Sequence, residues 1–189
     1  IDPPEHTLVA YSAENLDIEA KYARAIALMR QNDVDKALEI VDGLLAQSSK
    51  DPFFLELKGD ILRNAGRIRE AIAPYQAAVS IAPWAALIRI NLAQVQLELN
   101  DDDLTDDALD NINGALRYEP DLAQAWHLAA IVHGRRQDLG NLALALAEHS
   151  ILQGRKSDTR RHVKQAKKFF SEGTPGWQRA QDIGNVIAD

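Results

Sequence analysis

Apolar residues recur at steps of three and four along most of the chain, the spacing that places them on one face of an α-helix. Short stretches of Gly, Asn, Asp, Pro or Ser separate ten such segments and predict where each helix ends. The predicted helices span residues 17–31, 34–47, 52–65, 68–81, 84–99, 105–117, 122–135, 140–153, 157–170 and 176–187. The strict alternation of a strand is absent, so the pattern predicts an all-α protein.

Residues 1–16 lack a sustained apolar period and contain Pro3 and Pro4. We therefore predict an extended lead-in or linker over 1–16 and a helical domain over 17–187. The chain begins with Ile1 rather than Met. We accordingly expect a processed product or a piece of a longer protein.

The helical segments repeat. Gly59 aligns with Ala93 and Gly66 with Asn100 when the chain is shifted by about 34 residues, which is the period of the tetratricopeptide repeat (TPR). The motif is filled by small, turn, aromatic and proline residues, which in the second repeat are Gly59, Gly66, Ala71, Tyr75, Ala78 and Pro83. The first repeat supplies Ala25, Asn32, Ala37 and Leu44, and the third supplies Ala93, Asn100, Ala108, Ala115 and Pro120.

Each motif residue has a physical reason. Gly59 and Ala71 are small because the two helices of a pair cross closely, and Gly66 can adopt a positive φ where a helix ends. The third repeat carries three extra residues, which we assign to a loop at Asp101–Asp103. The later repeats are weaker, and residues 176–187 form an apolar stripe suited to a terminal cap. The prediction is a TPR-type right-handed α-solenoid of about four to five helix pairs with a C-terminal capping helix.

Catalytic and metal-binding patterns are missing from the sequence. Cysteine is absent, which excludes disulfides, thiolate nucleophiles and cysteine zinc sites. The five histidines do not form a His-x-x-x-His or HExxH pattern. His133 and His149 lie on successive helices and could meet, but we interpret the histidines as partly exposed helix residues. The acidic run that starts at Asp101 lacks the Gly and Glu of a calcium loop. We predict a protein that is not an enzyme, with no cofactor or metal of its own.

Charge is distributed unevenly. The net charge is −7, yet residues 154–179 hold eight basic and two acidic side chains, a local charge of +6. One interpretation is a solvated helix face, and the other is a docking surface for an acidic protein or anionic head groups. The docking residues would be Arg160, Arg161, Lys164, Lys167 and Lys168. Nucleic acid is disfavoured as a partner because no aromatic residues are interleaved with these charges.

The first helices of the repeats are expected to line a groove. TPR domains that hold C-terminal carboxylates place Lys and Asn there, whereas this chain places Glu56 and Asp60, which would repel an anionic tail. We therefore predict a groove for extended or unfolded protein segments, with mixed polar and aromatic contacts. Its residues would be Tyr22, Glu56, Asp60, Arg63, Gln94 and His127.

Three runs go beyond the general repeat: residues 52–62, 73–75 and 173–183. With them, residues 20–184 resemble the C-terminal TPR region of bacterial periplasmic zinc metalloproteases related to the β-barrel assembly-enhancing protease. The resemblance implies a periplasmic location in Gram-negative bacteria and a preceding protease domain that would carry the HExxH zinc site. It also implies a role in outer-membrane protein quality control, with the protease domain or the outer-membrane assembly machinery as partner.

Two alternatives to this role remain. One is a free-standing TPR scaffold or co-chaperone, and the other is a TPR-like RNA or DNA binder. No segment approaches the ~20 apolar residues that cross a bilayer, and the start of the chain does not have the pattern of a signal peptide. The periplasmic prediction therefore depends on the resemblance alone.

Overall fold

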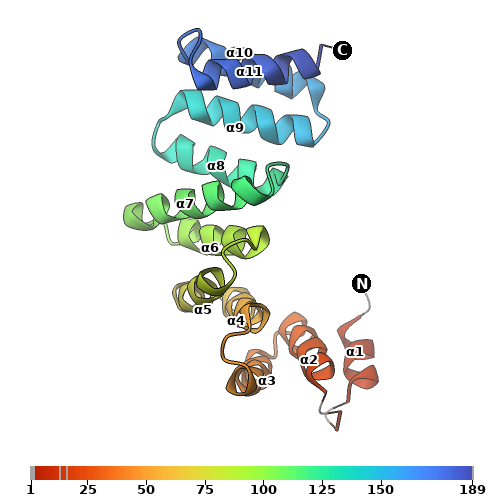
Figure 1. The fold of residues 1–189 in the computed structure, drawn as a ribbon. Coiled ribbons are helices and arrows are strands. Elements are labelled where there is room, and N and C mark those ends of the chain that lie inside the picture. Colours follow the sequence, from red (N-terminus) through yellow and green to blue (C-terminus); the bar gives the residue numbers. More distant parts are fainter. Residues whose placement is uncertain (1–2, 13, 16, 189) are drawn as a thin grey trace. The chain divides into compact units, whose positions relative to one another are not determined.

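The computed structural model describes residues 3–12, 14–15 and 17–188, and within these ranges it contains helices and no strand (Figure 1). The helices are α1 (Pro4–Ala10), α2 (Ile18–Arg30), α3 (Val34–Gln47), α4 (Pro52–Asn64), α5 (Ile68–Ile81), α6 (Ala86–Glu98), α7 (Asp102–Tyr118), α8 (Ala123–Arg135), α9 (Leu139–Leu152), α10 (Lys156–Phe169) and α11 (Pro175–Val186). This architecture confirms the predicted TPR-type helical solenoid.

The chain divides into two compact units, Ile1–Asn100 with α1 to α6 and Asp101–Asp189 with α7 to α11. The division falls at the connection before α7, inside the range predicted as one solenoid domain. A single domain over 17–187 stays a prediction.

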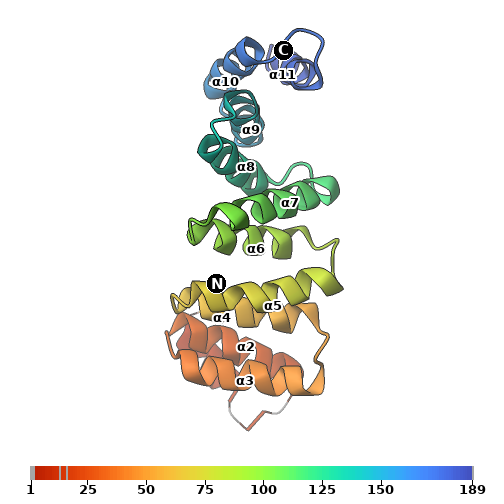
Figure 2. The same ribbon diagram turned by 90° about the vertical axis from the view of Figure 1, so that its left-hand side faces the viewer.

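In unit 1, the helices pack as antiparallel pairs, α2 with α3 and α4 with α5 (Figure 2). Apolar residues from successive helices form its core, because each amphipathic helix buries one stripe. Ala25, Val41 and Ile61 belong to one cluster, and Tyr75 and Leu92 to the next. The small residue expected at a close helix crossing is confirmed at Gly59, since a Cβ placed there would lie 2.7 Å from the Tyr75 ring.

The turns between paired helices share one backbone feature, a residue with positive φ that recurs at the repeat period. Asn32, Gly66 and Asn100 follow one another at the repeat period and have φ values of 62°, 73° and 52°. This left-handed conformation favours Gly and tolerates Asn, which is why these residue types recur there. The equivalent turn in unit 2 uses Gln137 at φ 57°, so the three-residue insertion shifts the period without changing the turn.

In unit 2, α11 packs against both α9 and α10 and ends the unit. Two buried clusters join these helices: one contains Ala143, Ala166 and Ala180, and the other Ala147, Val163 and Ile183. The position of α11 agrees with the predicted capping helix, whose apolar stripe included Ala180 and Ile183.

The predicted loop at Asp101–Asp103 is wrong, because α7 already begins at Asp102. The Asp101 side chain caps the helix by accepting a hydrogen bond from the Asp103 backbone N–H at 3.1 Å. Asp102 and Asp103 then lie in the first turn, where carboxylates interact favourably with the helix dipole. The three extra residues therefore lengthen a helix.

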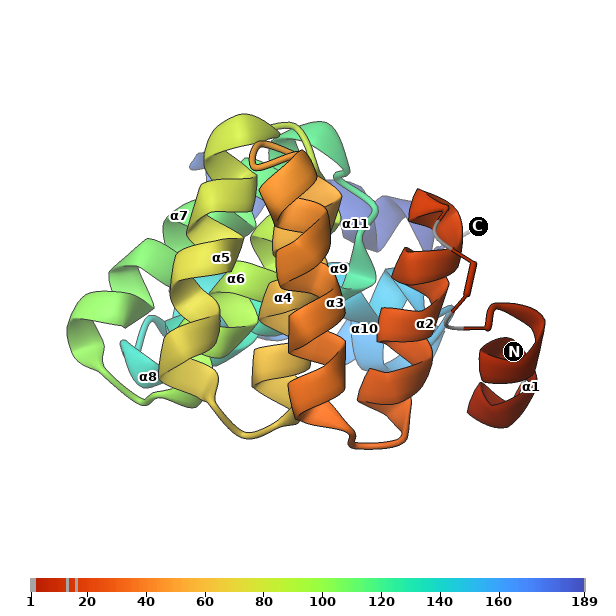
Figure 3. The ribbon, with the colours of Figure 1, turned by 90° about the horizontal axis from the view of Figure 1, so that it is seen from below.

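The extended lead-in is also wrong in part, because Pro4–Ala10 form the helix α1 beside α2 (Figure 3). Pro4 fits the first turn of a helix, which needs no backbone donor there. Leu8 packs against the core of the first repeat, and Gln31 Nε2 donates to Glu5 Oε1 at 3.3 Å. These contacts come from residues distant in sequence, which local periodicity does not register.

Candidate functional site

Unit 1 carries five of the six predicted groove residues on the first helices of its repeats: one on α2, three on α4 and one on α6. We call Tyr22, Glu56, Asp60, Arg63 and Gln94 the A-helix face. Asn91 Nδ2 on α6 donates to Glu56 Oε1 on α4 at 3.0 Å. Arg63 on α4 donates from Nη2 and Nε to Glu98 Oε1 on α6 at 2.9 and 3.1 Å. Both contacts therefore join neighbouring first helices of successive repeats.

Two carboxylates dominate the charge of the A-helix face. Glu56 and Asp60 lie one turn apart on α4, and both are half-buried. Burial raises the pKa of Glu56, the Asp60 charge raises it further, and the Asn91 hydrogen bond opposes both. Burial also raises the pKa of Asp60, although the Tyr75 hydroxyl donates to that carboxylate. The face thus holds negative charge that is partly desolvated.

Aromatic side chains border these carboxylates. The Tyr22 ring on α2 lies 6.0 Å from the Phe54 ring, centroid to centroid, at an interplanar angle of 40°. Burial raises the pKa of Tyr22, and the charges of Glu56 and Asp60 raise it further. Tyr22 therefore lies within electrostatic range of the two carboxylates.

The two remaining groove residues differ in position. Gln94 lies on α6 between Asn91 and Glu98, within one turn of each. His127 lies on α8 in unit 2, where its ring centre is 5.3 Å from that of His149. The role of all six predicted groove residues stays a prediction.

The disfavoured alternative, a pairing of His133 with His149, is not what the structure has: the His149 ring lies beside His127, and His133 places Nδ1 3.3 Å from Asp138 Oδ2. His149 Nδ1 also lies 2.9 Å from the Ala123 carbonyl oxygen. Within the described residues, no three His, Cys, Asp or Glu side chains gather as a metal site.

A pH-dependent stability difference is expected for Glu56→Gln. A raised pKa means that the folded state favours the protonated carboxyl, so its contribution to stability is present below the unfolded pKa, near 4.5, and is lost as pH rises through the folded value. Glu56→Gln should therefore raise the free energy of unfolding at pH 7 and change it little below pH 4, as measured by urea unfolding.

Glu70→Gln is the control with the opposite sign. Hydrogen bonds from Arg67 lower the pKa of Glu70, so its charged form favours the fold at pH 7 and this contribution is lost on acidification. Removing that charge should lower stability at pH 7. Equal responses of the two variants would contradict the assigned electrostatics.

The predicted basic residues of unit 2 all lie on α10, in two different states. Arg161 Nη2 pairs with Asp158 Oδ1 at 3.0 Å. Lys167 Nζ lies 4.3 Å from the centre of the Trp177 ring and donates to Gln181 Oε1 at 2.5 Å. These two side chains are committed to contacts within unit 2.

Arg160, Lys164 and Lys168 form the remaining stripe, one residue every four along α10. All three are exposed, and within the described residues none has a carboxylate at ion-pair distance. They line a shallow hollow together with Val163 and Lys167. We call this narrower set of three residues the α10 stripe, and its role in docking stays a prediction.

Sequence reasoning missed Asn91 and Glu98, which hold Glu56 and Arg63 in place. The repeat contained a usable signal, because both pairs are separated by 35 residues, one more than the period. A second pairing, without a signal in the sequence, is that of the exposed Arg179 with the buried Glu148.

None of the helices in the described part of the chain has the length and apolar character needed to cross a membrane. The tetratricopeptide repeat family model matches residues 14–52 and 22–86. Comparison with curated proteins finds no match.

Three solved structures illustrate what the chain is similar to. MamA is 15% identical with a TM-score of 0.66, covering 97% of this chain and 95% of that one. MamA 41-end from Desulfovibrio magneticus RS-1 is 14% identical with a TM-score of 0.65, covering 90% and 92%. YrrB, described as a TPR protein with an unusual peptide-binding site, is 15% identical with a TM-score of 0.65, covering 98% and 96%.

At these identities the structural similarity shows the fold alone. The family match, the regular spacing of the left-handed turns and the helix pairing agree with one another. Residues 14–86 therefore contain tetratricopeptide repeats, and the chain has a TPR-type helical fold.

Proposed function

We propose that this chain is a non-catalytic protein-binding module whose A-helix face receives an extended segment of a partner. The observation that carries this proposal is the pair Glu56 and Asp60, two half-buried carboxylates one turn apart. Arg63, the cation of this face, is already held by Glu98. A TPR-type fold supports protein binding as the function class, since stacked repeats present extended binding surfaces.

The same chemistry selects the segment. A Lys or Arg side chain would relieve the repulsion between Glu56 and Asp60, whereas a carboxylate would add to it. The half-buried Tyr22, whose ring packs near the buried Phe54 ring, supplies an aromatic edge for an apolar side chain next to that Lys or Arg. The preferred ligand is thus an extended segment with a basic residue followed or preceded by an apolar one.

Two ten-residue peptides that differ only in Lys against Glu at the central position test this proposal. The basic peptide should bind at least ten times more tightly in fluorescence anisotropy and should shift the amide resonances of α2, α4 and α6. Glu56→Gln, which keeps an acceptor for Asn91, should weaken it, whereas Glu119→Gln in unit 2 should not. Preference for the acidic peptide would overturn the proposal.

A finer proposal concerns the parent protein. The runs at residues 52–62 and 173–183 support a recognition region of a periplasmic zinc metalloprotease that acts in outer-membrane protein quality control. The alternative is a free-standing scaffold or co-chaperone. A coding sequence that encodes a signal peptide and an HExxH motif ahead of Ile1 would favour the protease, and its absence would favour the alternative.

Cleavage assays on such a parent protein would separate the role of its protease domain from the role of residues 17–187. A binding region tethered to a protease raises the local substrate concentration. Removing residues 17–187 should impair cleavage of physiological protein substrates more than cleavage of a short peptide. Equal loss of both activities would contradict recognition by this region.

The α10 stripe supports docking of an acidic protein surface. If it docks one, association should weaken as salt shortens the Debye length from ~10 Å to ~3 Å. Arg160→Glu with Lys164→Glu should slow association, measured by surface plasmon resonance, and should leave the circular dichroism spectrum unchanged. Arg161→Glu is the matched control, because Arg161 already has Asp158 as its partner. Unchanged kinetics in both tests would leave the stripe a solvated face.

A further inference from the structure

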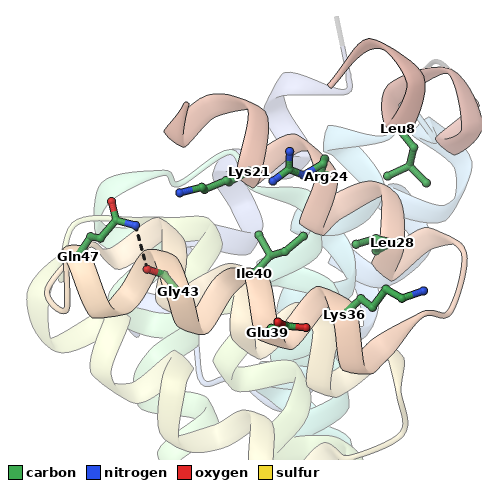
Figure 4. Close-up of a pocket in the computed structure, with 9 residues that line it drawn as sticks. All are labelled: Leu8, Lys21, Arg24, Leu28, Lys36, Glu39, Ile40, Gly43 and Gln47. Carbon is green, nitrogen blue, oxygen red and sulfur yellow. Dashed lines mark hydrogen bonds between the residues drawn. The ribbon is translucent and has the colours of Figure 1, made fainter. Parts of the chain in front are cut away.

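A furrow of about 530 Å³ opens between α1, α2 and α3 in unit 1, and none of its lining residues belongs to the A-helix face. Figure 4 shows Leu8 reaching in from α1, Arg24 and Leu28 from α2, and Ile40 from α3. Gly43 leaves its far end open, since no atom lies within 4 Å of a Cβ built there. The furrow therefore has an apolar floor, and its charged lining comprises three cations, Lys21, Arg24 and Lys36, and one carboxylate, Glu39.

The repeat provides an internal reference for this furrow. A second furrow of about 330 Å³ lies between α3, α4 and α5. A shift by one repeat period superposes six lining positions of the two furrows. In the order first furrow then second, these are Leu8 and Asp42, Arg24 and Lys58, Leu28 and Leu62, Lys36 and Glu70, Glu39 and Ala73, and Ile40 and Pro74.

The larger volume of the first furrow has a structural cause. In the second furrow, α3 forms one wall and continues to Gln47. In the first, α1 forms the matching wall and ends at Ala10, which corresponds to Leu44 of α3. The last turn of that wall is thus missing, and the space beside Gly43 is where it would lie.

The charge of the first furrow is also incomplete. In the second, Lys58 Nζ pairs with Asp42 Oδ1 at 2.7 Å. In the first, Arg24 stands in the place of Lys58, but the place of Asp42 is taken by the apolar Leu8. Arg24 is 8% exposed and donates to the carbonyl oxygens of Ser12 and Asn15, yet in the described part of the chain no carboxylate lies at ion-pair distance from it.

A buried guanidinium without a carboxylate is costly, which favours an anionic group from a partner. Lys21 and Lys36 also line the furrow, so its cations outnumber its one carboxylate, Glu39, and the balance of charge favours an anionic ligand. We propose that the furrow is a second protein-binding site, which takes a helical turn of a partner that presents an apolar side chain and a carboxylate. This inference does not depend on the A-helix face.

The probe for this site is the helix that fills the equivalent place one repeat later. We would use a labelled peptide with the sequence of residues 33–48. A staple between the residues that correspond to Glu39 and Gly43, both exposed in α3, would stabilise the helix and leave Asp42 free to bind. The stapled peptide should bind the full chain and shift amide resonances of α1, α2 and α3. The Asp42→Lys version should bind at least tenfold more weakly, the size expected for one charge-assisted hydrogen bond.

Two variants of the protein complete the test. Gly43→Leu fills the furrow at a position with free space, so it should abolish peptide binding while leaving the melting temperature equal or higher. Lys21→Glu should weaken binding of the original peptide and improve binding of the Asp42→Lys peptide. Gln76→Leu, at an exposed position of α5, is the control and should leave the binding of both peptides unchanged.

The proposal would be overturned by equal affinity for the two peptides, by binding that survives Gly43→Leu, or by resonance shifts confined to other helices. Saturation of the furrow by dodecanoate without any peptide binding would also overturn it, because the site would then accept a fatty acid. Since Glu56 does not line the furrow, Glu56→Gln should leave this peptide unaffected, and failure here is distinguishable from failure of the A-helix face.

Discussion

Replacing Gly59 by Ala is expected to lower the free energy of unfolding of unit 1 by about 2 kcal/mol, because an overpacking cost of about 3 kcal/mol exceeds the gain in helix propensity. The new Cβ would lie 2.7–2.8 Å from three atoms of the Tyr75 ring. That ring is fully buried and its hydroxyl donates to Asp60, so it has no room to withdraw. The gain in helix propensity, about 1 kcal/mol, only partly offsets this clash.

Gly43→Ala is the matched control, because it makes the same substitution in the helix of a neighbouring repeat with no atom within 4 Å of the new Cβ. It should stabilise unit 1 by up to about 1 kcal/mol through helix propensity alone. Chemical denaturation of the two variants checks both values. A Gly59→Ala variant as stable as Gly43→Ala would mean that the close crossing of α4 and α5 is not required.

Replacing Arg179 by Ala is expected to destabilise unit 2 by about 2 kcal/mol, because it breaks an ion pair in which Glu148 is buried and Arg179 is exposed. Arg179 on α11 donates from Nε and Nη2 to the two carboxylate oxygens of Glu148 on α9, and Nη2 lies 2.9 Å from Oε2. Glu148 has a side chain that is 4% exposed, so the variant would leave a buried charge without its partner. The full cost of about 3–5 kcal/mol for breaking a buried pair is reduced here, because water reaches the half-exposed arginine.

Three further variants locate the origin of that loss. Glu148→Gln should cost less than Arg179→Ala, since it removes the buried charge and keeps an acceptor. The double variant should lose little beyond Arg179→Ala alone, which is the signature of one coupled pair. Arg160→Ala on exposed α10 should stay within about 0.5 kcal/mol of the parent. Additive losses in the double variant would show that the pair does not join α11 to α9.

Local pattern was sufficient to predict the helices of the repeats. The predicted helices at 34–47 and 68–81 coincide with α3 and α5, because their ends are set by turn residues such as Gly66. Gly59 and Tyr75 were assigned to the motif from spacing alone, and the structure places them in contact. Periodicity reports which face a helix buries, and this is the information that a stacked repeat uses.

Contacts between distant residues were beyond that reasoning. The helix α1 depends on Leu8 packing into the first repeat. The start of α7 depends on Asp101 as a helix cap, and a run of aspartates in the sequence is equally compatible with a loop. The site was predicted in part. Glu56 and Asp60 follow from their place in the motif, but Asn91 is a partner that only a comparison of successive repeats at an offset of 35 would have revealed.

The central claim is that the charge of Glu56 on the A-helix face selects the segment that binds. Its most direct test is the ratio of affinities for the Lys and Glu peptides, measured on the parent and on Glu56→Lys at the same ionic strength. The account predicts a preference for the Lys peptide of at least tenfold in the parent, and a ratio near one or reversed in Glu56→Lys. An unchanged ratio in Glu56→Lys would contradict it.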